Sequence, residues 1–280
     1  MGIGLPIPIY IYKRGTKMKI GFIGGGNMAC AIVNGVVASG LCKPCDVTVC
    51  DISVETLKKY DNGIITSTNN GDALSCDYIV LAVKPFIISK ILEQLATYDI
   101  SNKVFISIAA GISVKEIKSV LGEDAKVVRV MPNTPAQVGE GMTVIAKPDE
   151  CVTESEMADV IKIFNAVGKT EIMAESMINV VTGVSGSSPA YVFMLIEAMA
   201  DAGVTGGIPR DTAYKLAAQS VLGSAKMVIE TGKHPAELKD MVCSPKGTTI
   251  EAVAELEARG FRSAIIEAIK KCNEKANNIN

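Results

Sequence analysis

The sequence predicts an α/β region built on a parallel sheet, followed by an all-α region. Three observations carry this prediction. Short apolar runs alternate with helix-like stretches from residue 19 to residue 130, a rhythm typical of a parallel sheet with helices on both faces. A cluster of glycines at 24–26 ends the first apolar run. After residue 175 no stretch has the character of a strand, and long apolar stretches read as helices.

Local signals define the strands and helices of the α/β region. Residues 78–83 have almost no polar content, so both faces of that strand should be buried. Gly40 closes the first helix, and Ser53 is placed to N-cap the second. We expect strands at 19–23, 47–50, 78–83, 104–108 and 126–130, and helices at 27–39, 53–60, 87–98 and 113–121.

The all-α region begins with a stretch that is apolar on nearly every side. Such a helix needs burial on every side, and a small helical domain can hardly provide this by itself. We therefore predict a homodimer that shares these helices, with a higher oligomer also open. Pro209 is well placed for the first turn of a helix. The expected helices are 177–204 with an interruption at 183–189, 209–230, one opened by Pro235, 247–258 and 262–277.

These expectations divide the chain into a domain at 18–173, a helical domain at 174–280, and an extension at 1–17 outside the fold. The start of the extension is apolar but contains Pro6 and Pro8, and its basic residues follow the apolar run. It therefore lacks the pattern of a signal peptide and is too short to span a bilayer. No later segment has the pattern of a membrane span.

Composition narrows the choice of partners and compartment. The chain has 280 residues, a formal net charge of −2 and no basic run, so nucleic acid and anionic membranes are poor candidate partners. Cys42 and Cys45, with Cys50 nearby, form the one suggestive cluster among eight cysteines. No second pair or matching histidine completes a zinc site, so we expect no metal. Free thiols in this number indicate the cytoplasm.

The glycine cluster fits a dinucleotide-binding motif. Gly24 allows a tight turn, Gly26 lets backbone approach a pyrophosphate, and Ala29 lets the helix pack closely on the strand. The pyrophosphate would lie on free N–H groups at the helix start. The motif follows a strand and opens a helix, which is the context that supports it. We therefore expect a Rossmann-type domain that binds its cofactor through Gly24, Gly25, Gly26, Asn27 and Met28; a ligand-free glycine turn is the alternative.

Asp51 ends the second strand, where the adenosine ribose would lie. A carboxylate can accept hydrogen bonds from ribose hydroxyls and repels a 2′-phosphate. No arginine follows within several residues. The cofactor is therefore NADH or NADPH, with NADH favoured by Asp51. A turn-forming or capping role for Asp51 is the alternative, and Ser53 or Thr48 could still accommodate a phosphate.

Two more segments follow strands at the same predicted edge, where ligands bind in such sheets. Lys84 could contact ribose or phosphate, or simply face solvent. Asn133 and Thr134 could hydrogen-bond near the nicotinamide, in a loop that Pro132 and Pro135 stiffen. The cofactor-contacting residues expected in these segments are Ala82, Val83, Lys84, Pro85, Asn133 and Thr134.

Residues 244–249, with the sequence SPKGTT, join two helices of the all-α region. The segment that begins at Gly247 offers free N–H groups that could hold a carboxylate. Two hydroxyls follow at Thr248 and Thr249. The segment suits a small amino-acid-like anion. A helix N-cap whose hydroxyl bonds its own backbone is the alternative.

Residues 238–253, LKDMVCSPKGTTIEAV, resemble the signature of pyrroline-5-carboxylate reductases. Lys246 stands where that family often has glycine, and Ser188 where glycine is common before proline. Further blocks agree in order and spacing: 22–29 (FIGGGNMA), 82–85 (AVKP), 109–112 (AAGI), 129–135 (RVMPNTP), 182–191 (TGVSGSSPAY) and 260–262 (GFR).

The resemblance implies an enzyme that passes hydride from NAD(P)H to the C=N bond of Δ1-pyrroline-5-carboxylate, giving L-proline in the last step of proline biosynthesis. It implies a helical dimerisation domain with the site between the two domains. Thr249 matches the catalytic threonine near the imine nitrogen, and Ser244, Gly247 and Thr248 match the loop that holds the substrate carboxylate. A β-hydroxyacid-dehydrogenase-like enzyme, whose general-base lysine has no counterpart here, and a non-catalytic dinucleotide sensor are the alternatives.

Overall fold

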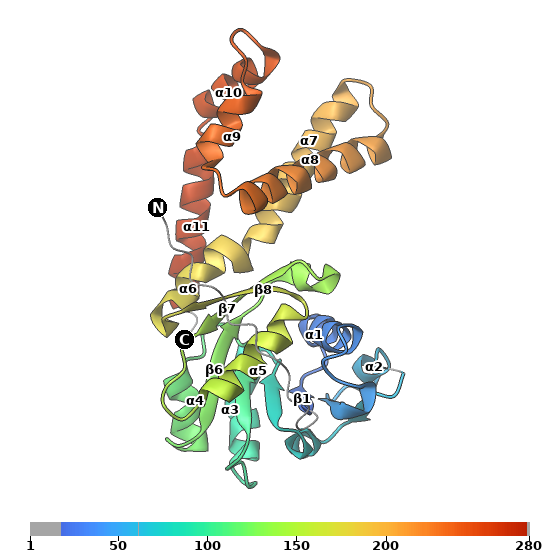
Figure 1. Cartoon of the computed structure of the whole chain (residues 1–280), viewed down its shortest axis with the longest axis vertical. Helices are drawn as coiled ribbons and strands as arrows, with labels where there is room; N and C mark the ends of the chain where they lie inside the picture. The colour runs from blue at the N-terminus through green and yellow to red at the C-terminus, as the bar shows by residue number, and fades with distance from the viewer. Residues whose placement is uncertain (1–17, 61, 279–280) are drawn as a thin grey trace.

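A computed structural model describes residues 18–60 and 62–278 (Figure 1). The strands are β1 (Ile20–Ile23), β2 (Val47–Cys50), β3 (Ile65–Ser67), β4 (Tyr78–Leu81), β5 (Val104–Ser107), β6 (Lys126–Met131), β7 (Gly141–Ala146) and β8 (Gly168–Met173). They form one sheet in the order β3-β2-β1-β4-β5-β6-β7-β8. Neighbours pair in parallel except β6 and β7, which are antiparallel. The predicted α/β fold class is confirmed.

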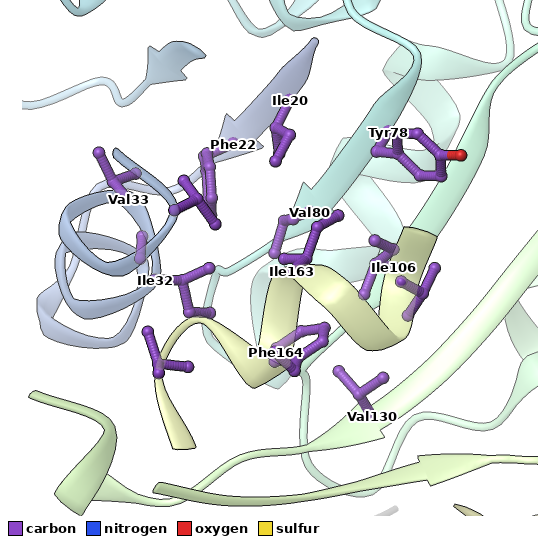
Figure 2. Packing of buried hydrophobic residues seen from close by; sticks show 14 of the residues in the cluster. Ile20, Phe22, Ile32, Val33, Tyr78, Val80, Ile106, Val130, Ile163 and Phe164 are labelled. Atoms are coloured by element: carbon purple, nitrogen blue, oxygen red, sulfur yellow. The ribbon is translucent and has the colours of Figure 1, made fainter. Parts of the chain in front are cut away.

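Helices cover both faces of the sheet, as alternate strand residues require. Phe22 belongs to an apolar cluster with α1 (Asn27–Ala38), α2 (Val54–Leu57) and α5 (Glu154–Asn165). Figure 2 shows side chains of α1 and α5 packed against this face. The next residue, Ile23, belongs to the opposite cluster with α3 (Pro85–Leu95) and α4 (Val114–Leu121). Short helical turns complete the domain: η1 (Pro44–Asp46), η2 (Asn70–Ser75) and η3 (Thr134–Val138).

Four elements of this region were not predicted: β3, β7, β8 and α5. The sheet was expected to be wholly parallel, but β6 and β7 are antiparallel. β3 has only three residues, and Ile65 is 50% exposed. β8 is largely exposed and carries Lys169 and Glu171, so it lacks the apolar alternation that marks a strand. β7 was also missed. The start of α5 does carry a sequence signal, the capping box of Thr153 and Glu156.

The structure corrects several predicted boundaries: the strand expected at 78–83 ends at Leu81, and the helix expected at 87–98 ends at Leu95. The second helix ends at Leu57 and not at residue 60, although Ser53 caps it as expected through a 3.2 Å bond from the Thr56 N–H to the Ser53 hydroxyl. The third helix begins at Pro85, two residues earlier than predicted. Proline suits this position because its fixed φ is helical and its missing N–H has no partner to lose there.

Within the described residues no strand follows Met173, as predicted. Figure 1 shows α7 and α8 as a hairpin that forms one arm of the helical half, while α9 and α10 lie in a second arm. The helix α11 returns from that arm to the base beside α6. The elements are η4 (Glu175–Met177), α6 (Ile178–Val181), the π-helical turn η5 (Thr182–Gly186), α7 (Ser188–Thr205), α8 (Arg210–Thr231), α9 (Pro235–Val242), α10 (Thr248–Ala258) and α11 (Phe261–Asn277).

The helical half buries very little within one chain. α9 and α10 contain no buried residue, and α8 buries only Ala213 and Ala217. Large apolar side chains on α7 and α8 remain exposed, including Phe193 at 63% and Ile229 at 81%. Exposure on this scale indicates an interaction surface.

The extension predicted at residues 1–17 lies outside the described residues. In the part of the chain that the structure covers, no helix combines the length and apolar character needed to cross a bilayer. Over the same residues, no group of three His, Cys, Asp or Glu side chains is arranged to hold a metal ion.

Candidate functional site

The ends of β1, β2 and β4 meet at a turn that only glycine fits. Gly24 has φ +98°, and its N–H donates to the Cys50 carbonyl over 2.7 Å. A Cβ at Gly24 would lie 2.6 Å from the Ala82 carbonyl oxygen. Side chains are therefore excluded here, as the sequence predicts. The turn brings the glycine loop, the end of β2 and the segment after β4 to one place.

The start of α1 is open to a ligand. Gly26 is the N-cap, no side chain caps the helix, and a Cβ built at Gly26 would meet nothing within 4 Å. Gly26 and Asn27 are exposed, while Met28 is half-buried and Ala29 is buried against the strand. The first N–H groups of α1 are thus presented to solvent with a positive helix terminus behind them. This is the geometry that a phosphate group requires.

Asp51 holds the glycine loop in shape. One carboxylate oxygen accepts the Gly25 N–H over 2.8 Å, and the other accepts the Ser53 N–H over 2.8 Å. Beneath the loop, burial together with Cys30 and Asp51 raises the pKa of Tyr60, and burial raises the pKa of Cys50 to about 12. Both groups are therefore neutral near pH 7. The turn-forming role considered for Asp51 is present, and its ribose contact stays a prediction.

The segment after β4 lies against the glycine loop. Ala82 and Val83 are half-buried and approach Gly24, whereas Lys84 is exposed and stands at the N-cap of α3. Pro85 fills the first helical position. The sheet order also places the segment after β5, which begins Ile108-Ala109, between the ends of β4 and β6. We did not predict this segment as part of the site, although it directly follows an apolar strand.

Asn133 links the end of β6 to the helical half. Its amide nitrogen donates to the Ser185 carbonyl in η5 over 3.0 Å, and its amide oxygen accepts the Met142 N–H over 2.8 Å. The residue is only 8% exposed. The Asn133 side chain, predicted to lie near nicotinamide, therefore has both its amide nitrogen and its amide oxygen in hydrogen bonds within the protein. Thr134 beside it is exposed. A π-helical turn such as η5 is frequent at functional sites.

Residues 244–247 form a tight turn before α10. The Gly247 N–H donates to the Ser244 carbonyl over 3.0 Å, and Lys246 has φ +57°. A Cβ at Gly247 would lie 2.3 Å from the Ser244 hydroxyl oxygen. No side chain caps α10, so the alternative of a hydroxyl bonded to its own helix end is not what the structure shows. The N–H groups of the first turn are open, with Thr248 exposed and Thr249 half-buried.

The two parts of the predicted site are not brought together within one chain. Figure 1 shows α9 and α10 in the outer part of the helical half, away from the sheet. The glycine loop, Asp51 and Ala82–Pro85 gather at the sheet edge, and Asn133 lies two strands further along. His234 serves as the N-cap of α9, with its Nδ1 accepting the Ala236 N–H over 3.2 Å.

Comparisons with known proteins match both halves of the chain. A family model described as pyrroline-5-carboxylate reductase dimerisation matches residues 175–279. One described as NADP oxidoreductase, coenzyme F420-dependent, matches residues 19–111. The pyrroline-5-carboxylate reductase of Escherichia coli K12 is 51% identical over 263 residues, which are 93% of this chain and 97% of that protein.

Solved structures of pyrroline-5-carboxylate reductases superpose on this chain over almost its whole length. A pyrroline-5-carboxylate reductase from Coxiella burnetii gives a TM-score of 0.86 at 34% identity, covering 94% of this chain and 98% of the other. The Plasmodium falciparum pyrroline carboxylate reductase with NADP bound gives a TM-score of 0.86 at 32% identity, and the match covers 94% of this chain and 99% of the other. The similarity thus spans the sheet and the helical half together.

Asn133→Ala is expected to lower the free energy of unfolding by about 2 kcal/mol, because it leaves the Met142 N–H and the Ser185 carbonyl without their bonds. Urea unfolding at one protein concentration measures this. Thr134→Ala is the matched control and should change stability by no more than about 0.5 kcal/mol, since that neighbour is exposed. Equal effects of the two substitutions would contradict the linking role of Asn133.

Proposed function

The chain belongs to the pyrroline-5-carboxylate reductase family, and from this premise we propose how its residues carry out the reaction. It is an NAD(P)H-dependent oxidoreductase that reduces the C=N bond of Δ1-pyrroline-5-carboxylate to give L-proline, the last step of proline biosynthesis. The observation that carries this function is the 51% identity to the Escherichia coli enzyme across both halves of the chain. The open glycine loop gives the physical reason why such a chain can hold a dinucleotide.

The cofactor is proposed to lie along the edge formed by Gly24–Met28, Asp51, Ala82–Pro85 and the loop of Asn133 and Thr134. The open N–H groups of α1 and the exposed Gly26 fit a pyrophosphate. Asp51 faces this loop through Gly25, and a carboxylate keeps spare lone pairs for ribose hydroxyls. When bound, the reduced nicotinamide supplies the hydride; the protein supplies binding and orientation.

The substrate carboxylate is proposed to lie at the start of α10, on the N–H groups that follow Gly247 and near the hydroxyls of Ser244 and Thr248. Thr249 is proposed to hydrogen-bond the ring nitrogen of the substrate. Reduction adds hydride to the imine carbon and is easiest when that nitrogen already carries a proton. A strong acid–base pair is then unnecessary, and positioning supplies much of the rate, with the Thr249 hydroxyl orienting the nitrogen.

A second copy of the chain is proposed to complete the site. Residues 244–249 are far from the glycine loop within one chain, and the arms that carry them expose large apolar side chains. A dimer that packs these helical arms together would bury those side chains and can bring the substrate loop of one subunit toward a cofactor edge. The end of the last strand at Met173 supports the proposed division of the chain between residues 173 and 174. Eight free cysteines support a reducing compartment, the cytoplasm.

The first test is turnover. Purified protein should oxidise NADH or NADPH when Δ1-pyrroline-5-carboxylate is added, and Thr249→Ala should lower kcat by about tenfold to a hundredfold with cofactor affinity nearly unchanged. Steady-state absorbance at the nicotinamide band measures both. Thr97→Ala, in an exposed loop of the sheet domain, is the matched control. Folded protein inactive with both cofactors would contradict the function, and equal loss of cofactor affinity would contradict the place of Thr249.

The second test concerns cofactor preference. We expect a higher kcat/KM with NADH than with NADPH, because the Asp51 carboxylate repels a 2′-phosphate. Asp51→Ala should reduce that preference, whereas Glu55→Ala, an exposed carboxylate four residues along, should leave it unchanged. If Asp51→Ala lowers kcat/KM for both cofactors equally, the carboxylate acts only by shaping the loop through its bond to Gly25.

The third test concerns assembly. Sedimentation should give at least twice the mass of one chain, and Phe193→Asp on α7 should shift the protein toward monomer and abolish turnover. Phe86→Asp is the control for oligomeric state, because Phe86 is 85% exposed but lies on the sheet domain. A fully active monomer would exclude a site shared between subunits.

A further inference from the structure

A cavity of about 360 Å³ lies between α4, the strands β6 and β7, and the first turn of the helical half. At about 30 Å³ per molecule this volume corresponds to roughly twelve water molecules, so it has room for a small organic or inorganic ion. None of the residues assigned to cofactor or substrate lines it. The lining residues are Val114, Lys115, Lys118, Glu123, Val127, Arg129, Ala146, Lys147, Pro148, Asp149 and Glu175.

One lysine that lines the cavity has all its hydrogen-bond donors engaged by neighbouring protein groups. Lys118 is 7% exposed, and its ammonium group contacts Asp149 at 2.5 Å, the Glu123 carbonyl at 2.8 Å and the Cys151 sulfur at 3.3 Å. Burial works against the charge, but the bonds to Asp149 and Cys151 outweigh it and raise the pKa of Lys118. Three donors with three acceptors leave this group nothing for a ligand.

Arg129 is not satisfied in the same way. The residue is 5% exposed. Its Nη2 donates to Asn179 over 2.8 Å, and its Nη1 reaches Glu175 only at 3.4 Å. Its Nε is buried with no hydrogen-bond partner in the described structure. An unmet N–H on a buried guanidinium is costly, because the group has lost water and gained no acceptor in return.

Two further cations line the same cavity. Lys115 and Lys147 are exposed, and neither has an ion-pair partner among the described residues. Apart from the Lys118–Asp149 pair, three positive side chains thus face two carboxylates, Glu123 and Glu175. A buried fork of donors with flexible ammonium groups around it suits an anion with several acceptor oxygens.

We propose that this cavity binds a small multiply charged anion, of the phosphate or polycarboxylate type, with Arg129 at its floor and Lys115 and Lys147 closing over it. Arg129 also joins the sheet to the helical half through Asn179 and Glu175, and Glu175 accepts the Val114 N–H at the start of α4 over 2.8 Å. An anion on Arg129 therefore lies at the joint between the two halves.

The test is calorimetric titration of the full chain, saturated with oxidised cofactor, at constant ionic strength. The bound cofactor excludes the anion from the glycine loop. Inorganic phosphate and citrate are the two probes. Lys115→Gln/Lys147→Gln should weaken binding of the effective probe at least tenfold, and Lys90→Gln, an exposed lysine of α3 outside the cavity, should leave it unchanged. The surface pair is chosen because removal of Arg129 risks the fold.

Binding of phosphate, of citrate or of both, with the expected loss in the double variant, supports the proposal and tells which oxyanion the cavity prefers. No binding of either probe, or binding that is equal in the double variant, overturns it, the latter by placing the anion elsewhere. Turnover of Lys115→Gln/Lys147→Gln without added anion should match that of the unaltered enzyme. The binding measurement does not rely on turnover, so it can fail while the assigned reaction stands.

Discussion

The closeness of Gly24 to Ala82 is the constraint on which the cofactor edge depends. Because a Cβ at Gly24 would lie 2.6 Å from the Ala82 carbonyl oxygen, the chain can turn there only with a left-handed glycine. The turn points the start of α1 outward and brings the end of β2 beneath it. Asp51 then fixes the loop by accepting the Gly25 N–H. The open N–H groups of α1 are thus a consequence of one backbone contact between two neighbouring strands.

The helical half obeys a different constraint, since it cannot bury itself. At its base, Asn273 accepts the Gly183 N–H over 3.0 Å, and Asn133 of the sheet region donates to the Ser185 carbonyl over 3.0 Å. Beyond the base, α9 and α10 bury nothing within the chain. The helical half is hydrogen-bonded to the sheet region at its base and exposes apolar side chains beyond it, so it is suited to hold a partner near the cofactor edge. In the proposed dimer, association would contribute to stability and to the site at once.

The sequence predicted what depends on local signals and missed what depends on distant contacts. The glycine motif, the strand ends and the helical character after residue 173 follow from spacing and composition. Asp51 and Asn133 were assigned to a cofactor. The local bond from the Ser53 N–H to Asp51 fits the turn-forming alternative, but the bond from Gly25 to Asp51 and both bonds of Asn133 join separate segments, which spacing does not reveal. β8 was missed because its pairing with β7 stabilises an exposed segment that lacks a strand pattern. Arg129 drew no attention beyond the motif it belongs to, because its unmet N–H exists only when the helical half packs over it.

Lys246 shows how a departure from a family pattern can be weighed once its backbone is known. The turn at 244–247 needs a positive φ at its third residue, which glycine adopts freely and lysine adopts at φ +57° at a cost of about 1–2 kcal/mol. The hydrogen bond of the turn joins the Ser244 carbonyl to the Gly247 N–H, so it does not require a bare backbone at Lys246. What lysine adds is a positive charge beside the helix start proposed to hold the substrate carboxylate. That charge has the sign that would attract a carboxylate, so lysine in place of glycine is compatible with the proposed role of this loop.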